Sequence, residues 1–148
     1  MLEEVKIDKL VHGGQGLGTL KSGQKIFVWN ALPGETVGVR VGRKKRDYAE
    51  GFAENIIKPS KDRVEPLDDA YLSTSPWQIL TLEAENKHKK QILADVYSRE
   101  KISLPTFELT HKGQTTLYRN KMEYSFWGDE AGLHLALYHR ASHGKRII

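Results

Sequence analysis

The chain has 148 residues, carries a net charge of +4 and contains no cysteine. Its length suits one ordinary domain or two very small ones, and the lack of cysteine excludes disulfides, a thiolate nucleophile and cysteine-ligated metals. No apolar run approaches the roughly 18 residues of a membrane span, and the amino terminus lacks the basic start and apolar core of a signal peptide. We therefore expect a cytoplasmic protein without membrane contacts.

The positive charge is unevenly distributed along the chain. Residues 1–58 carry ten Lys or Arg and seven Asp or Glu. Residues 59–100 carry six basic and eight acidic residues, and residues 101–148 carry seven basic and four acidic residues. Two basic segments thus flank an acidic one. This partition favours contacts with a polyanion at both ends of the chain.

Residues 1–58 are predicted to form four or five short strands, because apolar and polar residues alternate along them. The residues expected to share one face of each strand are Val5 and Ile7; Ile26 and Val28; and Val37, Val39 and Val41. Phe27 and Trp29 share the opposite face of their strand. So many short strands in under sixty residues, with glycine at the corners, predict a mainly β fold built on a small closed barrel.

A glycine-rich stretch, HGGQGLGTLKSGQKIFVWNALPGE, covers residues 12–35. Its glycines do not fit a dinucleotide fingerprint, because the third glycine of that motif is missing at the required spacing. They do not fit a P-loop either, because the lysine comes at the wrong position. The β-branched and aromatic residues that follow predict a strand, where a phosphate-binding loop needs a helix. Gly13, Gly14, Gly16 and Gly18 are therefore expected to allow positive φ and sharp coiling at a corner of the sheet.

A basic run lies at the turn between two of the predicted strands. It contains Arg40, Arg43, Lys44, Lys45 and Arg46. Such runs are often only solvated turns, but small barrels bind single-stranded nucleic acid by stacking bases on aromatic residues while basic loops hold phosphates. We predict that this run binds nucleic acid together with Phe27 and Trp29. The alternative for either aromatic residue is that it closes the end of the barrel.

Residues 59–74 are predicted to be a linker, and an amphipathic helix follows. Ser75 can cap this helix, Pro76 suits its first position, and apolar residues at spacings of three and four form one stripe that ends near Arg99. The stripe consists of Trp77, Leu80, Ala84, His88, Ile92 and Val96. We expect His88 to lie at the edge of the core and not to bind a ligand.

Residues 115–139 are predicted to form a hairpin, with strands over LYRNKMEYSF and LHLALYH and a turn at WGDEAG. The last residues, GKRII, resemble the start of another apolar strand. A hairpin beside one helix is marginally stable in water, so we expect an amino-terminal piece of a longer protein. The expected organisation is a barrel at 1–58, a linker at 59–74 and a helix with a partial β-domain at 75–148.

The six histidines show no catalytic or metal-binding pattern. His139 and His143 are four residues apart, but the segment between them has no helical pattern to bring them to one face. No H-E-x-x-H motif is present, and nothing in the spacing selects an acid–base pair. We expect no metal site, and we assign no catalytic residue within the chain.

The sequence resembles a known family over nearly its whole length. HGGQGLGTLKSGQKIFVWNALPGETVGVRV, continuing through KRDYAEGFAENIIKPSKDRVEP, resembles the TRAM domain, a small five-stranded, OB-like RNA-binding barrel. STSPWQIL with the charged helix, then YRNKMEYSFWG and GLHLALYHR, are similar to the next region of the RNA uracil-5-methyltransferases. The resemblance implies an OB-like barrel followed by an amphipathic helix and an incomplete β-hairpin region of α+β type.

The resemblance also implies chemistry that lies elsewhere. Enzymes of this family bind S-adenosylmethionine in a carboxy-terminal Rossmann-like domain, where a cysteine attacks C6 of the flipped uracil. Neither maps onto this sequence, so we expect the chain alone to bind no cofactor and to be inactive. Many relatives carry an iron–sulfur cluster on four cysteines, which a chain without cysteine cannot hold. Arg119, Asn120 and Lys121 match a basic strand similar to surfaces that grip substrate RNA.

The expected function is RNA binding and substrate orientation for an S-adenosylmethionine-dependent RNA uracil-5-methyltransferase. The resemblance makes 23S ribosomal RNA the expected substrate, with contacts to single-stranded or loop regions. Two alternatives stay open from the sequence. One is a stand-alone TRAM protein that binds or chaperones RNA without catalysis, and the other is a small enzyme that uses its own histidines.

Overall fold

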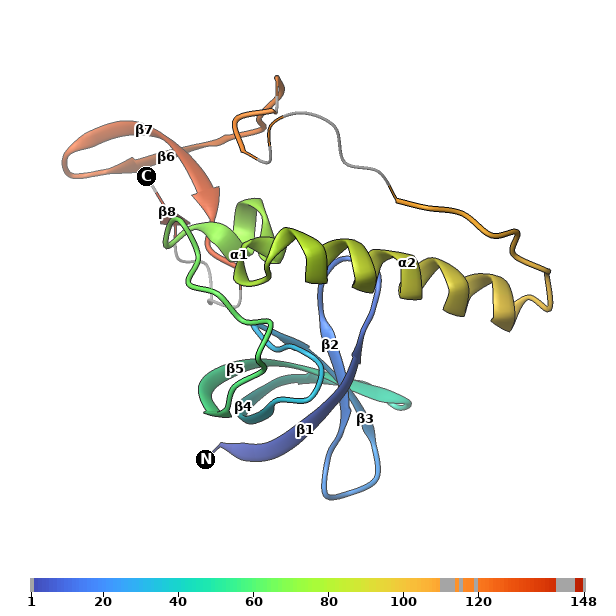
Figure 1. Cartoon of the computed structure of the whole chain (residues 1–148). Helices are drawn as coiled ribbons and strands as arrows, with labels where there is room; N and C mark the ends of the chain where they lie inside the picture. The colour runs from blue at the N-terminus through green and yellow to red at the C-terminus, as the bar shows by residue number, and fades with distance from the viewer. Residues whose placement is uncertain (1, 110–113, 115, 119, 141–145, 148) are drawn as a thin grey trace.

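The computed structural model describes residues 2–109, 114, 116–118, 120–140 and 146–147. Five strands wind into a closed barrel, and a long helix crosses above it (Figure 1). The barrel strands are β1 (Glu3–Leu10), β2 (Gly16–Thr19), β3 (Lys25–Trp29), β4 (Thr36–Lys44) and β5 (Tyr48–Lys58). The predicted fold, mainly β with a five-stranded barrel followed by a helix and a hairpin, is confirmed.

The barrel has the strand order β1-β2-β3-β5-β4, and β4 pairs with β1 to close it. All of its strand pairs are antiparallel except β3 and β5, which run parallel from Lys25↔Tyr48 to Trp29↔Phe52. Closure leaves this sheet without an unpaired edge, so its backbone groups are satisfied within the barrel.

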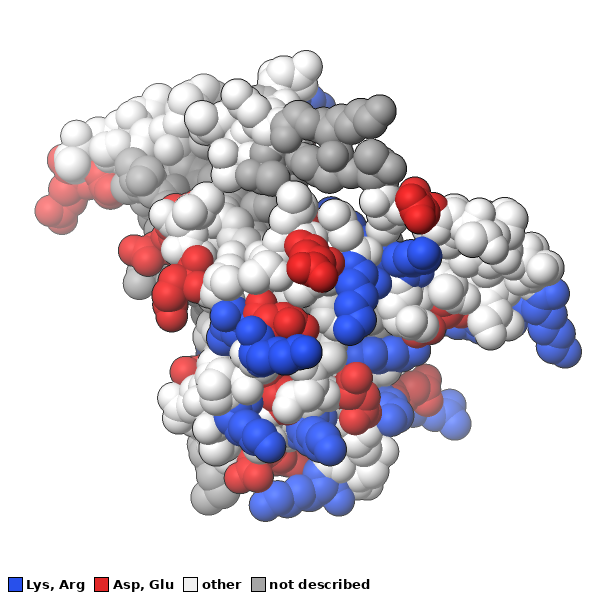
Figure 2. Space-filling model, viewed as in Figure 1, with Lys and Arg blue, Asp and Glu red and all other residues white. Residues whose placement is uncertain are grey.

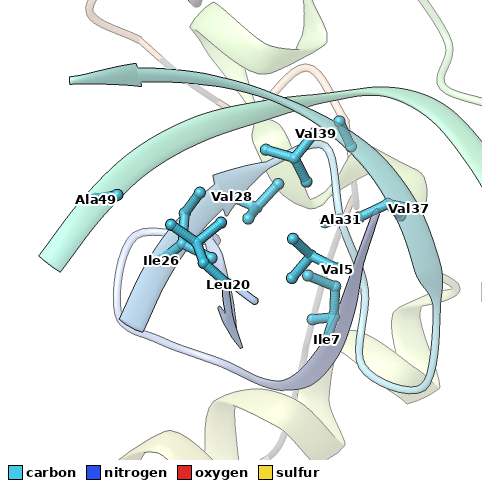
Figure 3. Close-up of a cluster of buried hydrophobic side chains, with 10 residues drawn as sticks. Val5, Ile7, Leu20, Ile26, Val28, Ala31, Val37, Val39 and Ala49 are labelled. Atoms are coloured by element: carbon cyan, nitrogen blue, oxygen red, sulfur yellow. The ribbon is translucent and has the colours of Figure 1, made fainter. Parts of the chain in front are cut away.

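The barrel interior is filled by aliphatic side chains from β1, β3, β4 and β5 and from the loops that follow β2 and β3 (Figure 3). The buried residues are Val5, Ile7, Leu20, Ile26, Val28, Ala31, Val37, Val39, Ala49 and Ala53. The faces predicted from alternation are therefore confirmed, with Val41 only partly buried against this core. Burial of such side chains contributes about 1.5–3 kcal/mol each for the larger ones, and it is the main source of the barrel's stability.

The glycines of β1–β2 serve two different purposes. Gly13 and Gly14 have φ of +91°, as expected for a turn. Gly16 and Gly18 lie inside β2 without positive φ, so the expectation of a left-handed conformation is wrong for them. A Cβ on Gly18 would lie 2.5 Å from Val5 Cγ1 and 2.7 Å from the Lys6 carbonyl oxygen. These two glycines are needed because neighbouring strands approach too closely for a side chain.

The long helix begins later than the sequence predicts, and a short helix, α1 (Tyr71–Thr74), lies at the end of the predicted linker. After α1, a 3-10 turn η1 covers Pro76–Ile79, and the chain then becomes extended at Leu80 before α2 (Leu82–Arg99). Thr81 is the true cap, since its hydroxyl accepts a hydrogen bond from the Ala84 N–H at 3.3 Å. A continuous helix from residue 76 is thus wrong, whereas the end at Arg99 is confirmed.

The break in the helix is a buried part of the fold. Ile79 and Leu80 are both buried in a second apolar cluster that joins the barrel to the helical region. The buried members are Leu10, Leu32, Ile79, Leu80 and Ala84, with Tyr71, Trp77 and Ile92 packed against them. Ile79 ends the 3-10 turn and Leu80 has extended backbone, with φ −122° and ψ 148°, so the change of conformation takes place inside this cluster.

The segment after β5 is attached to the barrel through a buried carboxylate. The Glu35 side chain is 0% exposed and accepts hydrogen bonds from the Ser60 N–H and the Arg63 guanidinium. The Val64 N–H continues the attachment by bonding to the Ile79 carbonyl. Residues 60–64 are therefore held in place between the barrel and η1.

The predicted hairpin is present but shorter. It consists of β6 (Ser125–Asp129) and β7 (Gly132–Tyr138), and β8 (Arg146–Ile147) pairs with β7, which confirms a strand in GKRII. The first strand begins at residue 125 and not near 117. Side chains just before it, such as Tyr124 at 50% exposure, have little to pack against, so extending the ladder would bury little apolar surface.

No helix in the described ranges is long and apolar enough to cross a membrane.

Candidate nucleic-acid interface

The predicted basic turn lies at the tip of the β4–β5 hairpin. We use "basic turn" for Arg43, Lys44, Lys45 and Arg46, all of which are exposed. The Lys45 N–H donates to the Tyr48 carbonyl at 2.8 Å. The Gln24 side-chain amide, from the β2–β3 loop, donates to the Lys45 carbonyl at 2.8 Å and to the Arg46 carbonyl at 3.3 Å.

These contacts hold the backbone of the basic turn and leave its side chains directed to solvent. Among the described residues, none of the four cations takes part in an ion pair. Four neighbouring positive charges that are not neutralised within the fold attract a polyanion. Figure 2 shows Lys and Arg side chains gathered over the barrel, with fewer Asp and Glu among them.

Arg40 differs from the basic turn. It pairs with Glu54 across the β4–β5 ladder, and its guanidinium lies 5.9 Å from the Phe52 ring centroid. Its charge is already balanced by a carboxylate, and its side chain is partly covered. The structure therefore separates Arg40 from the four cations of the basic turn, which form no ion pair within the described residues.

Phe27 lies on the outer face of β3, where parallel pairing brings it next to β5. Its ring packs edge-on against Tyr48, with centroids 5.4 Å apart and planes at 82°. The Lys45 ammonium lies 5.2 Å from the Tyr48 centroid. Tyr48 thus connects the aromatic surface to the basic turn. Sequence reasoning missed Tyr48, and the only signal for it was its position directly after the basic run.

Trp29 has a different neighbour, although it shares the outer face of β3 with Phe27. The Arg140 guanidinium lies 4.3 Å from the Trp29 ring centroid, close enough for a cation–π interaction. The Arg140 backbone N–H donates to the Ser73 hydroxyl at 2.8 Å. Trp29 therefore contacts the segment that follows β7, and Phe27 does not share this environment.

The second group of predicted RNA-binding residues lies after the long helix. Asn120 and Lys121 are exposed, and Lys121 pairs with Glu123 at 2.7 Å. In Figure 1 this segment runs on the opposite side of α2 from the barrel. Arg119, the third member, lies outside the described residues. The structure does not bring Asn120 and Lys121 to the basic turn.

The histidines are placed on separate parts of the fold. His88 is half-buried on α2, and burial lowers its pKa below the usual value. His134 contacts the Asp129 carboxylate at 3.0 Å across the β6–β7 turn. Within the described ranges, no three His, Asp or Glu side chains gather closely enough to hold a metal ion.

Comparison with known proteins agrees with this geometry. Residues 3–53, which include β1 to β4 and the first half of β5, match the family described as the TRAM domain. The barrel therefore matches the family that the glycine-rich stretch resembles.

The similarity to relatives extends well past the barrel. An RNA methyltransferase of Thermotoga maritima, whose particular reaction is not characterised, is 33% identical over 135 residues, covering 90% of this chain and 31% of the relative. The 23S rRNA (uracil(1939)-C(5))-methyltransferase RlmD of Halomonas elongata is 31% identical over 147 residues, or 98% of this chain and 30% of the relative. An RNA methyltransferase of Halalkalibacterium halodurans, BH0687, is 32% identical over 149 residues.

These matches confirm the resemblance to the RNA uracil-5-methyltransferases. The chain spans about a third of the length of the relatives it matches.

Proposed function

We propose that this chain is the RNA-binding, substrate-orienting amino-terminal part of an S-adenosylmethionine-dependent RNA uracil-5-methyltransferase that acts on 23S rRNA. The observation that carries the proposal is the length of the similarity, which reaches 98% of the chain in the Halomonas elongata enzyme. A TRAM protein that acts alone would account for similarity in the barrel, but not in α2 and the hairpin as well.

In this proposal the parts of the chain have separate roles. Residues 1–58 bind RNA, residues 59–74 connect, and residues 75–148 belong to a β-domain that positions the RNA for chemistry. The basic turn holds phosphates, while Phe27 offers an aromatic ring to an unpaired base. Trp29, Arg40, Asn120 and Lys121 contribute less to RNA affinity, because each already contacts a neighbour or lies far from the turn. Arg119 is kept as a candidate on the family resemblance alone.

Methyl transfer takes place outside these residues in this assignment of roles. The cysteine nucleophile that the family implies has no counterpart in a chain without cysteine, and S-adenosylmethionine belongs to the implied Rossmann-like domain. We expect the 148-residue chain to transfer no methyl group to 23S rRNA fragments and to bind no S-adenosylmethionine in calorimetric titration. Incorporation of labelled methyl by the purified chain would contradict this division of roles.

Salt dependence of RNA binding tests the role of the basic turn. Each phosphate contact to a single strand contributes about 0.7 to the slope of log affinity against log salt. In fluorescence anisotropy with a labelled single-stranded RNA, the double variant Arg43→Gln, Lys44→Gln should therefore flatten the slope by about 1.4. It should also weaken binding to unrelated sequences about equally, because phosphates carry no sequence information.

A matched control removes the same charge elsewhere on the barrel. Lys58 and Lys61 are exposed, and Lys58 pairs with Thr36 at the opposite end of the β4–β5 ladder from Lys44. The double variant Lys58→Gln, Lys61→Gln should keep a slope close to that of the parent. Equal slopes in the parent and the Arg43, Lys44 variant would show that the basic turn is not the RNA site.

A further inference from the structure

A groove of about 520 Å³ runs between the outer face of the barrel and the carboxy-terminal half of α2. Leu17, Phe27 and Tyr48 line it from β2, β3 and β5. Ile92 and Val96 line it from α2. The barrel wall thus carries two aromatic rings, with His12 and Glu50 beside them, and the helix wall carries two aliphatic side chains. A flat apolar group can insert between the rings and the aliphatic side chains.

The aromatic wall has a shape that favours a planar ligand. The Phe27 and Tyr48 rings meet at 82°, so they form a corner in which a ring can stack on one while the other bounds its edge. Both side chains are only half-buried. Every nucleobase has a π face that stacks on such rings, whatever its sequence.

Polar groups lie around this apolar interior. Lys9 of β1 and Asp95 of α2 form an ion pair that links the two walls and closes part of the rim. Gln15 and Arg99 also line the groove, and neither side chain makes a hydrogen bond within the described part of the chain. Arg99 interacts electrostatically with Asp95 but, like Gln15, keeps side-chain N–H groups that can pair with the polar edge of a base.

The groove is continuous with the basic turn. Tyr48 lines the groove, and the Lys45 ammonium lies 5.2 Å from its ring centroid. A strand whose phosphates contact the basic turn therefore passes beside the mouth of the groove. The positive charge selects a polyanion, and the aromatic corner selects among polyanions for one that carries planar rings.

We propose that the groove receives one unpaired nucleobase of the RNA strand whose phosphates the basic turn holds. The base stacks on one of the two rings, Tyr48 or Phe27, with the other ring at its edge, and α2 forms the second wall. The inference rests on the RNA binding proposed above and adds to it a role for the helix. The barrel without α2 would offer the aromatic corner but no enclosed base site.

Filling the groove from the helix side tests this assignment without altering the barrel. Val96 is 43% exposed on α2, and Val96→Trp places a large ring in the groove. The probe is a set of single-stranded RNAs with 2-aminopurine at successive positions. The parent should quench the fluorescence of one position strongly, and Val96→Trp should abolish that quench and weaken binding about 5- to 150-fold, the contribution of one stacked base.

The matched control adds the same ring to the same helix. Leu93 is 37% exposed and does not line the groove, so Leu93→Trp should bind and quench like the parent. A second test asks whether binding needs an aromatic ring at position 48. Tyr48→Phe should keep the affinity for the RNA, whereas Tyr48→Leu should lose affinity with an unchanged salt slope. Melting temperatures show whether each variant is folded, and Val96→Trp decides the question if Tyr48→Leu does not fold.

The outcomes separate this inference from the proposed function. If the parent binds RNA with a salt slope that depends on the basic turn, but Val96→Trp quenches and binds like the parent, the base site is overturned and the RNA-binding function stands. If the parent shows no salt-dependent RNA binding at all, both proposals are overturned.

Discussion

Glu35 and Arg63 form a two-point ion pair inside the protein, between the β3–β4 loop and the segment that follows β5. The Arg63 guanidinium donates from Nε to Glu35 Oε1 at 2.6 Å and from Nη2 to Oε2 at 2.8 Å. The same carboxylate accepts the Leu32 N–H at 2.8 Å and the Ser60 N–H at 3.0 Å. Four donors therefore converge on one fully buried acid.

Removing the arginine should be strongly destabilising. Arg63→Met leaves the Glu35 carboxylate buried without its cation, and breaking a buried pair in this way costs about 3–5 kcal/mol. Urea unfolding of both proteins measures the difference. Glu54→Gln is the control, because it breaks an exposed pair with Arg40 that is worth at most about 1 kcal/mol. Similar losses in the two variants would contradict the burial argument.

Replacing both Glu35 and Arg63 separates the contribution of the ion pair to stability from that of the backbone hydrogen bonds to Glu35. In many proteins two apolar residues can replace a buried ion pair without loss. Here the double variant Glu35→Met, Arg63→Met leaves the buried Leu32 N–H and the partly buried Ser60 N–H without acceptors, which costs about 1–3 kcal/mol for the Leu32 group. We expect it to remain less stable than the parent in urea unfolding. Full recovery would show that these backbone bonds contribute little.

The glycines in the barrel strands should differ sharply in tolerance to alanine. A Cβ at Gly18 meets Val5 Cγ1 at 2.5 Å, whereas at Gly42 the nearest atom is the Glu50 carbonyl oxygen at 3.5 Å. Gly18→Ala should cost about 1–3 kcal/mol through overpacking, and Gly42→Ala should change stability by no more than about 0.5 kcal/mol. Equal denaturation midpoints would mean that the strands can separate at β2 without loss.

His88 should make stability depend on pH near neutrality. Burial lowers its pKa, the charge of Asp62 opposes the shift, and Lys87 adds to it. The folded state thus binds the proton less tightly than the unfolded state, whose histidine titrates at about 6.5. The stabilisation is complete above that pH and is lost as the pH falls through the folded pKa.

Replacing His88 isolates this effect from the other histidines. The free energy of unfolding of the parent should fall between pH 7.5 and pH 5.5, and that of His88→Gln should fall less over the same interval. Urea denaturation at the two pH values gives both differences. If the two proteins lose the same free energy, His88 is not responsible.

The Trp29–Arg140 contact should protect the indole ring. In a background with Trp77→Phe and Trp127→Phe, Trp29 is the only tryptophan, and Arg140→Ala should increase its quenching by acrylamide. The lost cation–π contact is worth about 0.5–1 kcal/mol at such a site. Lys101→Ala, which removes an exposed cation elsewhere, should leave the quenching unchanged. Unchanged quenching in Arg140→Ala would contradict the contact.

The sequence by itself determined which residues of the barrel strands face inward. Alternation of apolar and polar residues reports burial directly, because successive side chains of a strand point to opposite faces. Val5, Ile26 and Val37 were identified in this way. The order of the motifs along the chain also determined the resemblance to the TRAM domain and the methyltransferases, since that comparison needs no contacts.

Only the tertiary structure decided what each outward-facing or polar residue contacts. Parallel pairing of β3 with β5 brings Tyr48 to Phe27, and the closed barrel brings Val5 against Gly18. Arg63 reaches Glu35 across 28 positions of sequence. Local patterns carry no record of such pairings, because they depend on how the chain returns to itself. That is why the sequence predicted the strands and the basic turn, but not the groove against α2 or the buried ion pair.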